Sequence, residues 1–200
     1  MTAIITEYYV ERHMAADARE RMIESAAVLF RERGVHGTSF SDVLEHSGAP
    51  RGSIYYHFPA GKAQLAEEAT RYAGKFTAAG LAAALADDDP VAAVRAFAAM
   101  WRKLLRSTDF GSGCPIVSAT LEGERSAAAR DAAGDAFRRW EDLLAGALER
   151  RGVPRKRARS LATLTVAAIE GAIVLARAQR SLAPLERVTD ELETLVSGAI

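Results

Sequence analysis

The sequence predicts an all-α protein built from about nine helical segments. Through most of its 200 residues, apolar side chains recur every three or four positions, as they do along one face of a helix. Glycine and proline residues separate these stretches, and no stretch of useful length alternates apolar and polar residues as a half-buried strand would. The composition, 49% hydrophobic and 26% charged, is that of a globular chain able to bury a core.

The first helix is expected over about residues 18–33. Its inner face carries Met22, Ile23, Ala26, Ala27 and Phe30, and Gly34 follows as a C-cap candidate. Residues 1–17 have no strong helical pattern and few basic residues, which favours an N-terminal arm without a role of its own.

Residues 39–58, SFSDVLEHSGAPRGSIYYHF, predict two short helices around a tight turn. Ser39 and Asp42 have capping-box spacing at the start of the first helix, and Gly48 ends it. The second helix is expected from Arg51 to His57, with Ile54 and Phe58 turned inward. Such a pair, packed on the preceding helix, is a helix-turn-helix.

The outward face of this second helix points to nucleic acid. It leaves two adjacent tyrosines exposed and includes Gly52, which costs about 1 kcal/mol relative to alanine in a helix. A helix that reads a DNA groove uses both features: glycine allows close backbone approach and hydroxyl groups bind phosphates. Arg51 can reach a guanine edge. The alternative is a capped helical hairpin with ordinary surface tyrosines.

Residues 18–66 resemble the DNA-binding domain of the TetR family of bacterial transcriptional repressors. The resemblance is carried by MIESAAVLF (22–30), RGVHGTSFSDV (33–43) and GAPRGSIYYHFPAGKAQL (48–65). The stretch GSGCPIVSATLEG (111–123) further resembles a branch that includes flavonoid- and lincomycin-linked regulators. The resemblance implies a cytoplasmic homodimer that binds a palindromic double-stranded DNA operator and is released by a small hydrophobic effector. Activation instead of repression stays open.

With that fold, residues 1–17 are an arm, 18–64 the DNA-binding domain and 65–200 a helical ligand-binding and dimerisation domain. The expected phosphate contacts are Thr38, Ser39, Tyr55, Tyr56, His57 and Lys62, and the residues expected near base edges are Arg51, Gly52 and Ser53. The formal net charge of the chain is zero, and residues 18–66 hold six basic against five acidic residues. Binding should therefore depend on local placement of charge and only modestly on salt.

The remaining helices are expected at about 62–85, 90–106, 115–123, 126–151, 155–182 and 184–198. The long helix at 62–85 should turn Leu65, Ala69, Tyr72, Phe76, Ala79 and Ala83 inward. Asp87, Asp88 and Asp89 before Pro90 are better explained as helix caps than as a cation site.

The helix at 155–182 is apolar nearly all round, which indicates burial on two sides. Glu170 at its centre argues against a membrane span. A two-fold four-helix contact with the last helix would bury the second side. The expected dimer interface is Leu161, Leu164, Ala168, Leu175, Leu185, Val188, Leu192 and Leu195.

Large apolar residues among the C-terminal helices are candidates for an effector pocket. They are Phe76, Phe97, Trp101, Phe110, Cys114, Ile116 and Trp140, and ordinary core packing is the alternative for each of them. A carboxylate in an apolar helix needs a partner, so Glu170 is expected to bind either the effector or an internal arginine such as Arg102 or Arg177. Close helix contact at the dimer seam is a third explanation.

Other classes of function have less support. No metal-binding, phosphate-loop or paired-carboxylate motif is evident, so we expect no enzyme, cofactor or metal. Cys114 is alone, which excludes an internal disulfide and fits a reducing cytoplasm; inert packing is favoured over a thiol sensor. The alternatives are a small-molecule-binding or enzymatic bundle with a vestigial helix-turn-helix, and a protein-interaction adaptor.

Overall fold

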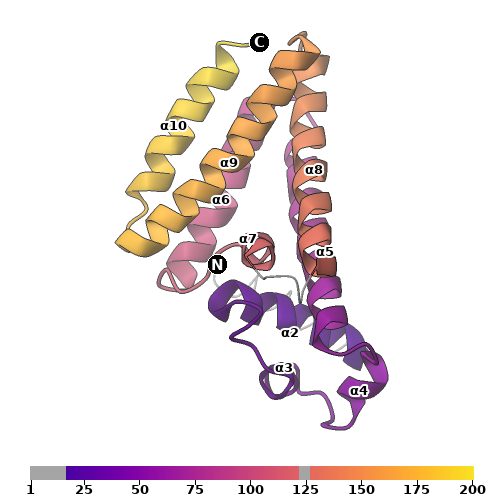
Figure 1. Cartoon of the computed structure of the whole chain (residues 1–200). Coiled ribbons are helices and arrows are strands. Elements are labelled where there is room, and N and C mark those ends of the chain that lie inside the picture. Colours follow the sequence, from indigo (N-terminus) through magenta and orange to yellow (C-terminus); the bar gives the residue numbers. More distant parts are fainter. Residues whose placement is uncertain (1–16, 122–126) are drawn as a thin grey trace.

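The computed structural model describes residues 17–121 and 127–200, and in these ranges it contains nine α-helices and no strand. In chain order they are α2 (Ala18–Arg33), α3 (Phe40–Ser47), α4 (Ser53–His57), α5 (Lys62–Ala84), α6 (Pro90–Ser107), α7 (Pro115–Thr120), α8 (Ala127–Arg150), α9 (Arg155–Gln179) and α10 (Ala183–Ser197). Figure 1 shows α2, α3 and α4 as a small unit below a larger bundle. The predicted all-α fold is confirmed.

The small unit has one core. Phe30 from α2, Val43 from α3 and Ile54 from α4 are buried in it together with Phe58. Asp17 caps α2 by accepting a hydrogen bond from the backbone N–H of Glu20 at 2.9 Å. The helix bounds at 18–33 agree with the prediction, whereas the rest of the predicted arm lies outside the described residues.

Helix α5 joins the small unit to the bundle and packs mainly on α8. The inward stripe predicted for it is wrong beyond Tyr72: Phe76, Ala79 and Ala83 are exposed, and Phe76 is 55% exposed. The reason is the close approach of Gly74, where a Cβ atom would lie 2.6 Å from that of Ala136. Helix α5 therefore turns its small residues, not Phe76, toward α8.

Turns and caps define the rest of the bundle. Asp89 accepts hydrogen bonds from the N–H groups of Val91 and Ala92, which confirms the predicted cap before α6. Helix α9 ends at Gln179, three residues earlier than predicted, because Arg180 adopts a left-handed conformation with φ of 48°. The predicted ends at 123 and 126 lie in a segment outside the described residues.

Helix α9 is long and apolar enough to cross a membrane by length and composition. In the fold it packs between α8 and α10, and Leu161, Val166, Ile169 and Ile173 are buried there. It is thus a core helix with one remaining apolar face, as the sequence predicted.

Candidate DNA-binding surface and effector region

Helix α4 is shorter than predicted and is held by a well-defined turn. Gly48 ends α3 with φ of 63°, a left-handed conformation that favours glycine. The carbonyl of Pro50 then accepts hydrogen bonds from the N–H and the hydroxyl of Ser53, at 2.9 and 2.7 Å. Arg51 and Gly52 therefore lie in the turn before α4, not in its first turn as predicted.

The outer face of α4 is open to solvent. Tyr55 is 70% exposed and Tyr56 83% exposed, while Ile54 and Phe58 are fully buried. The ring of Tyr55 packs edge-on against Phe40 with 5.6 Å between centroids, and Tyr56 packs against His57 at 5.2 Å. Both phenol rings are thus supported at their base, and their outer surfaces have no cover among the described residues.

The described part of the chain does not require a glycine at position 52. Its φ is negative, and a Cβ atom built on it would meet no described atom within 4 Å. A side chain would therefore fit, so any need for glycine must come from a molecule outside this chain. Close approach of a DNA backbone is one such need.

The remaining DNA-contact candidates differ in availability. Ser39 is exposed, and it forms the predicted capping box with Asp42, whose pKa it lowers by hydrogen bonding to the carboxylate. Lys62 lies in the first turn of α5, and its Nζ donates to the carbonyl of His36 at 3.3 Å. The predicted phosphate contact of Thr38 is wrong. This residue is 1% exposed and its hydroxyl donates a hydrogen bond to the carbonyl of Gly34, so it stabilises the fold from inside.

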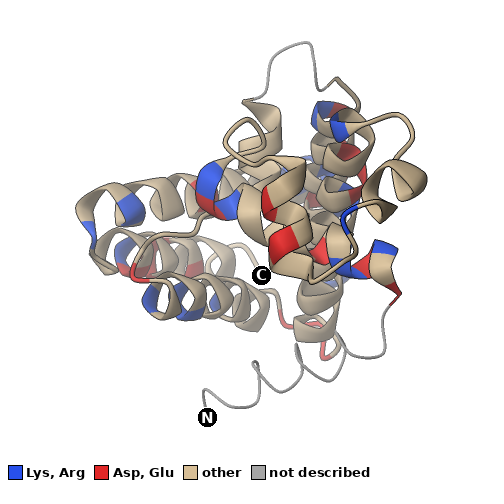
Figure 2. Ribbon diagram, turned by 90° about the horizontal axis from the view of Figure 1, so that it is seen from below, with Lys and Arg blue, Asp and Glu red and all other residues tan. Residues whose placement is uncertain are grey.

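Charge is not gathered on this side of the molecule. Seen from below, Lys and Arg segments alternate with Asp and Glu segments (Figure 2). Arg33 forms an ion pair with Asp42 at 3.6 Å, which offsets part of the positive charge beside α3. The surface therefore agrees with the near-neutral balance of residues 18–66.

Part of the predicted effector group comes together inside the bundle. Phe97 packs edge-on against Trp101 and Trp140, with centroids 6.3 and 5.9 Å apart, and all three are buried. The indole of Trp140 donates to the carbonyl of Gly74 at 3.1 Å, whereas Trp101 Nε1 has no partner in the described chain. Phe76 is not among them, because it lies on the outer face of α5.

Glu170 is the chemically unusual residue of this region. It is 7% exposed, and neither carboxylate oxygen has a hydrogen-bond partner among the described residues. Burial raises its pKa to about 7, and the neighbouring Cys114 thiol, which is not placed as a hydrogen-bond partner of either oxygen, lowers it. The pKa of Cys114 is itself raised, first by burial and then by the charge of Glu170.

The two arginines expected as internal partners of Glu170 bind elsewhere. Arg102 Nε lies 3.9 Å from Glu186, and Arg177 donates to backbone carbonyls of the loop before α7. The contact of Arg177 with this loop could not be predicted from the sequence, because no local pattern indicates a contact between a side chain and a backbone carbonyl 66 residues apart. Glu170 thus keeps an unmet need for a donor.

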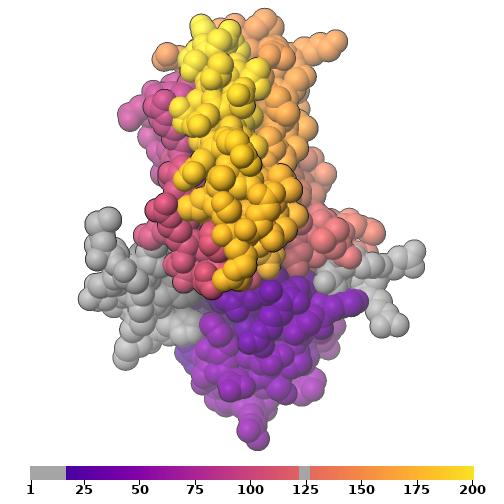
Figure 3. All heavy atoms as spheres, turned by 90° about the vertical axis from the view of Figure 1, so that its left-hand side faces the viewer, coloured from indigo at the N-terminus to yellow at the C-terminus, as the bar shows by residue number. Residues whose placement is uncertain are grey.

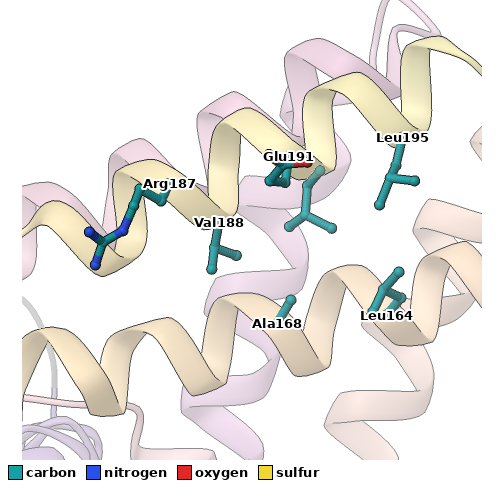
Figure 4. Close-up of a pocket in the computed structure, with 7 residues that line it drawn as sticks. Leu164, Ala168, Arg187, Val188, Glu191 and Leu195 are labelled. Atoms are coloured by element: carbon teal, nitrogen blue, oxygen red, sulfur yellow. The ribbon is translucent and has the colours of Figure 1, made fainter.

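Helices α9 and α10 lie side by side on one face of the molecule (Figure 3). Leu164, Leu175 and Leu195 are exposed there, with Ala168 and Val188 half-buried between them. Figure 4 shows Leu164, Ala168, Val188 and Leu195 turned toward the space between the two helices, with Arg187 and Glu191 along α10. The prediction that the dimer interface includes Leu161, Leu185 and Leu192 is wrong, because these side chains are buried within their own chain.

Comparison with known proteins agrees with this architecture. Residues 22–69 match the family model described as bacterial regulatory proteins, tetR family, and residues 90–191 match the C-terminal domain of LmrA/YxaF-like transcriptional regulators.

Two curated relatives span nearly the whole chain. The HTH-type transcriptional regulator Rv0196 of Mycobacterium tuberculosis is 45% identical over 89% of this chain and 93% of its own. LmrA of Bacillus subtilis, also named an HTH-type transcriptional regulator, is 31% identical over 90% and 97%. A crystal structure of a TetR transcriptional regulator from Chloroflexus aurantiacus is 30% identical, covers 94% of this chain and 96% of that one, and has a TM-score of 0.75.

Proposed function

This chain belongs to the TetR family of bacterial transcriptional regulators, and from that premise we propose a homodimeric repressor that a small effector releases from DNA. The observation that carries the proposal is the outer face of α4, where Tyr55 and Tyr56 stand exposed beside a glycine that the chain itself does not require. A short helix with such a face suits the major groove of a duplex.

The proposed contacts divide into two kinds. The first kind binds phosphates and positions the helix without selecting a sequence. These residues are Ser39, Tyr55, Tyr56, His57 and Lys62. Arg51, Gly52 and Ser53, in the turn and at the start of α4, approach base edges. Thr38 is left out because its hydroxyl is used within the chain.

Dimerisation is proposed through the face formed by α9 and α10. The exposed side chains Leu164, Leu175 and Leu195 would otherwise remain in water, and each apolar side chain covered contributes about 1.5–3 kcal/mol. Arg187 and Glu191 at the edge of the groove carry charges of both signs, which a two-fold contact can pair. Two-fold symmetry would present two copies of α4 to successive major grooves of a palindrome, roughly 34–36 Å apart.

The effector is proposed to bind among α6, α7, α8 and α9, with Phe97, Trp101 and Trp140 as apolar neighbours. Glu170 would accept a hydrogen bond or pair with a cation on that molecule, which supplies the partner it lacks. The effector is therefore a mostly apolar compound that carries at least one hydrogen-bond donor. Regulation in the cytoplasm, not catalysis, is the activity we assign.

Selection of DNA from a random pool tests the proposal. The wild-type protein should enrich a palindrome, and its affinity for that duplex should exceed its affinity for a scrambled duplex by about 10³-fold or more. If no sequence is enriched, the protein is not a sequence-specific DNA-binding regulator, and a helical ligand-binding protein is the remaining interpretation.

A further inference from the structure

The loop between α6 and α7 connects two parts of the molecule that are far apart in sequence. The backbone N–H of Gly113 donates to the carbonyl of Arg31 at 2.8 Å, and the Ser112 hydroxyl lies 3.4 Å from a carboxylate oxygen of Glu32. Arg31 is in the last turn of α2, where helix carbonyls lack partners within the helix. The loop therefore caps the C-terminus of the helix that supports α3 and α4.

The opposite side of the same loop is held by Arg177 of α9. Its guanidinium donates to the carbonyls of Gly111 at 3.0 Å and Phe110 at 3.4 Å. It also lies directly over Gly113, where a Cβ atom would be 2.6 Å from one terminal nitrogen of Arg177. A planar guanidinium with several fixed donors is suited to hold consecutive carbonyl groups in one geometry.

The loop itself is in a costly conformation. Asp109 and Phe110 have φ of 47° and 62°, in the left-handed region, which aspartate tolerates but an aromatic residue such as Phe110 rarely adopts. Such backbone angles persist only where the surroundings impose them. Arg177 holds one side of the loop and the end of α2 the other, while the Asp109 carboxylate is paired with Arg180. Loss of the contact with Arg177 or with α2 should let residues 110–113 relax.

We propose that residues 110–113 form a second joint between the C-terminal bundle and the DNA-binding unit, and that Arg177 is its positioning residue. The covalent connection runs through α5, which also packs on α2 and pairs Tyr72 with Glu24. The joint fixes the other end of α2, so together the two contacts set the orientation of α4. This inference rests on the proposed function, because the orientation matters to DNA only if α4 reads it.

The joint also supplies a route from the effector region. Glu170 precedes Arg177 by two helical turns and so lies on the same face of α9. Cys114, the residue that follows the joint, lies beside the Glu170 carboxylate. An effector group that pairs with Glu170 therefore acts at one end of this loop, and the loop also contacts α2. One contiguous set of contacts thus couples the effector region to the DNA-binding unit.

Pulsed electron paramagnetic resonance can measure the joint within one chain. Spin labels on Ser41→Cys in α3 and Arg139→Cys in α8, both exposed, report the distance between the two parts. The native thiol, Cys114, is buried, and labelled chains are diluted with unlabelled chains so that only distances within a chain contribute. Arg177→Met removes the contact, whereas Gly113→Ala displaces the guanidinium without removing it. Arg159→Met, which breaks an exposed ion pair with Asp142 near the start of α9 and far from Arg177, is the matched control.

Both test variants should shift or broaden the distance distribution while their helix content stays at the wild-type level, and the control should do neither. Affinity for the DNA that the wild-type protein selects should fall by about 5- to 150-fold in the same two variants. A wild-type distance distribution in Gly113→Ala and in Arg177→Met would overturn the joint; if Arg177→Met does not fold, Gly113→Ala decides alone. Shifted distances in a protein that selects no DNA would instead refute the proposed function and leave the joint standing.

Discussion

Replacement of Glu170 by glutamine should make the protein less sensitive to alkaline pH. The pKa of Glu170 is about 7 in the folded chain and 4.5 in its reference state, because burial disfavours the carboxylate. Between these two values the folded state holds a proton that the unfolded state has lost. Folding stability therefore falls as pH rises through this window, and the full loss is present above pH 7.

The size of the effect follows from the shift. The difference between 4.5 and about 7 corresponds to roughly 3 kcal/mol, since one pKa unit is worth about 1.4 kcal/mol. Glu170→Gln keeps the shape of the side chain and removes the ionisation. The difference in unfolding free energy between the variant and the wild type should thus grow by about 3 kcal/mol in favour of the variant from pH 4.5 to pH 8.

Urea unfolding at fixed protein concentration, repeated across that pH range, measures this difference. Glu149→Gln, at an exposed position of α8, is the matched control and should follow the wild type at each pH. If the stability difference between Glu170→Gln and the wild type does not change with pH, the carboxylate is not buried without a partner. Glu170 would then have no need for a hydrogen-bond donor from an effector.

Four further variants test the DNA-binding and dimer surfaces. Arg51→Ala should relax sequence choice at one base pair by about 1–3 kcal/mol, whereas Tyr56→Phe should weaken binding to all duplexes alike by about 1 kcal/mol; equal losses in gel shifts would contradict this division. Lys62→Ala should lower the slope of log affinity against log salt by about 1, and an unchanged slope would remove Lys62 from the phosphate contacts. Leu164→Glu should convert the dimer to a monomer in sedimentation, with Phe76→Glu, another exposed apolar position, retaining the wild-type mass.

Most helix starts and ends could be predicted from short sequence patterns. The start of α3 was predictable because Ser39 and Asp42 form a capping box from residues three apart, and α6 because Asp89 and Pro90 cap and begin it. These features depend only on neighbours along the chain. The bounds of α2 at 18 and 33 were likewise set by Gly34 and by helical spacing.

The wrong predictions for Phe76, for the inward leucines of α10 and for Arg177 share one cause, which is packing against distant helices. Phe76 fits the apolar spacing of α5, but Gly74 approaches α8 so closely that the helix is rotated away from it. On α10 the sequence could not separate Leu185 and Leu192, which face α9 and α6, from the exposed Leu195. Arg177 was predicted near Glu170 but binds a loop whose position depends on four helices.

Hydroxyl-radical footprinting of the selected palindrome shows where the protein covers the DNA backbone, and therefore whether α4 reads the duplex. We expect two protected patches one helical turn apart (about 10 base pairs) that both disappear when Tyr55 and Tyr56 are replaced by alanine in a protein that still folds and dimerises. Protection that survives this double replacement would contradict the claim that α4 is the DNA-reading element.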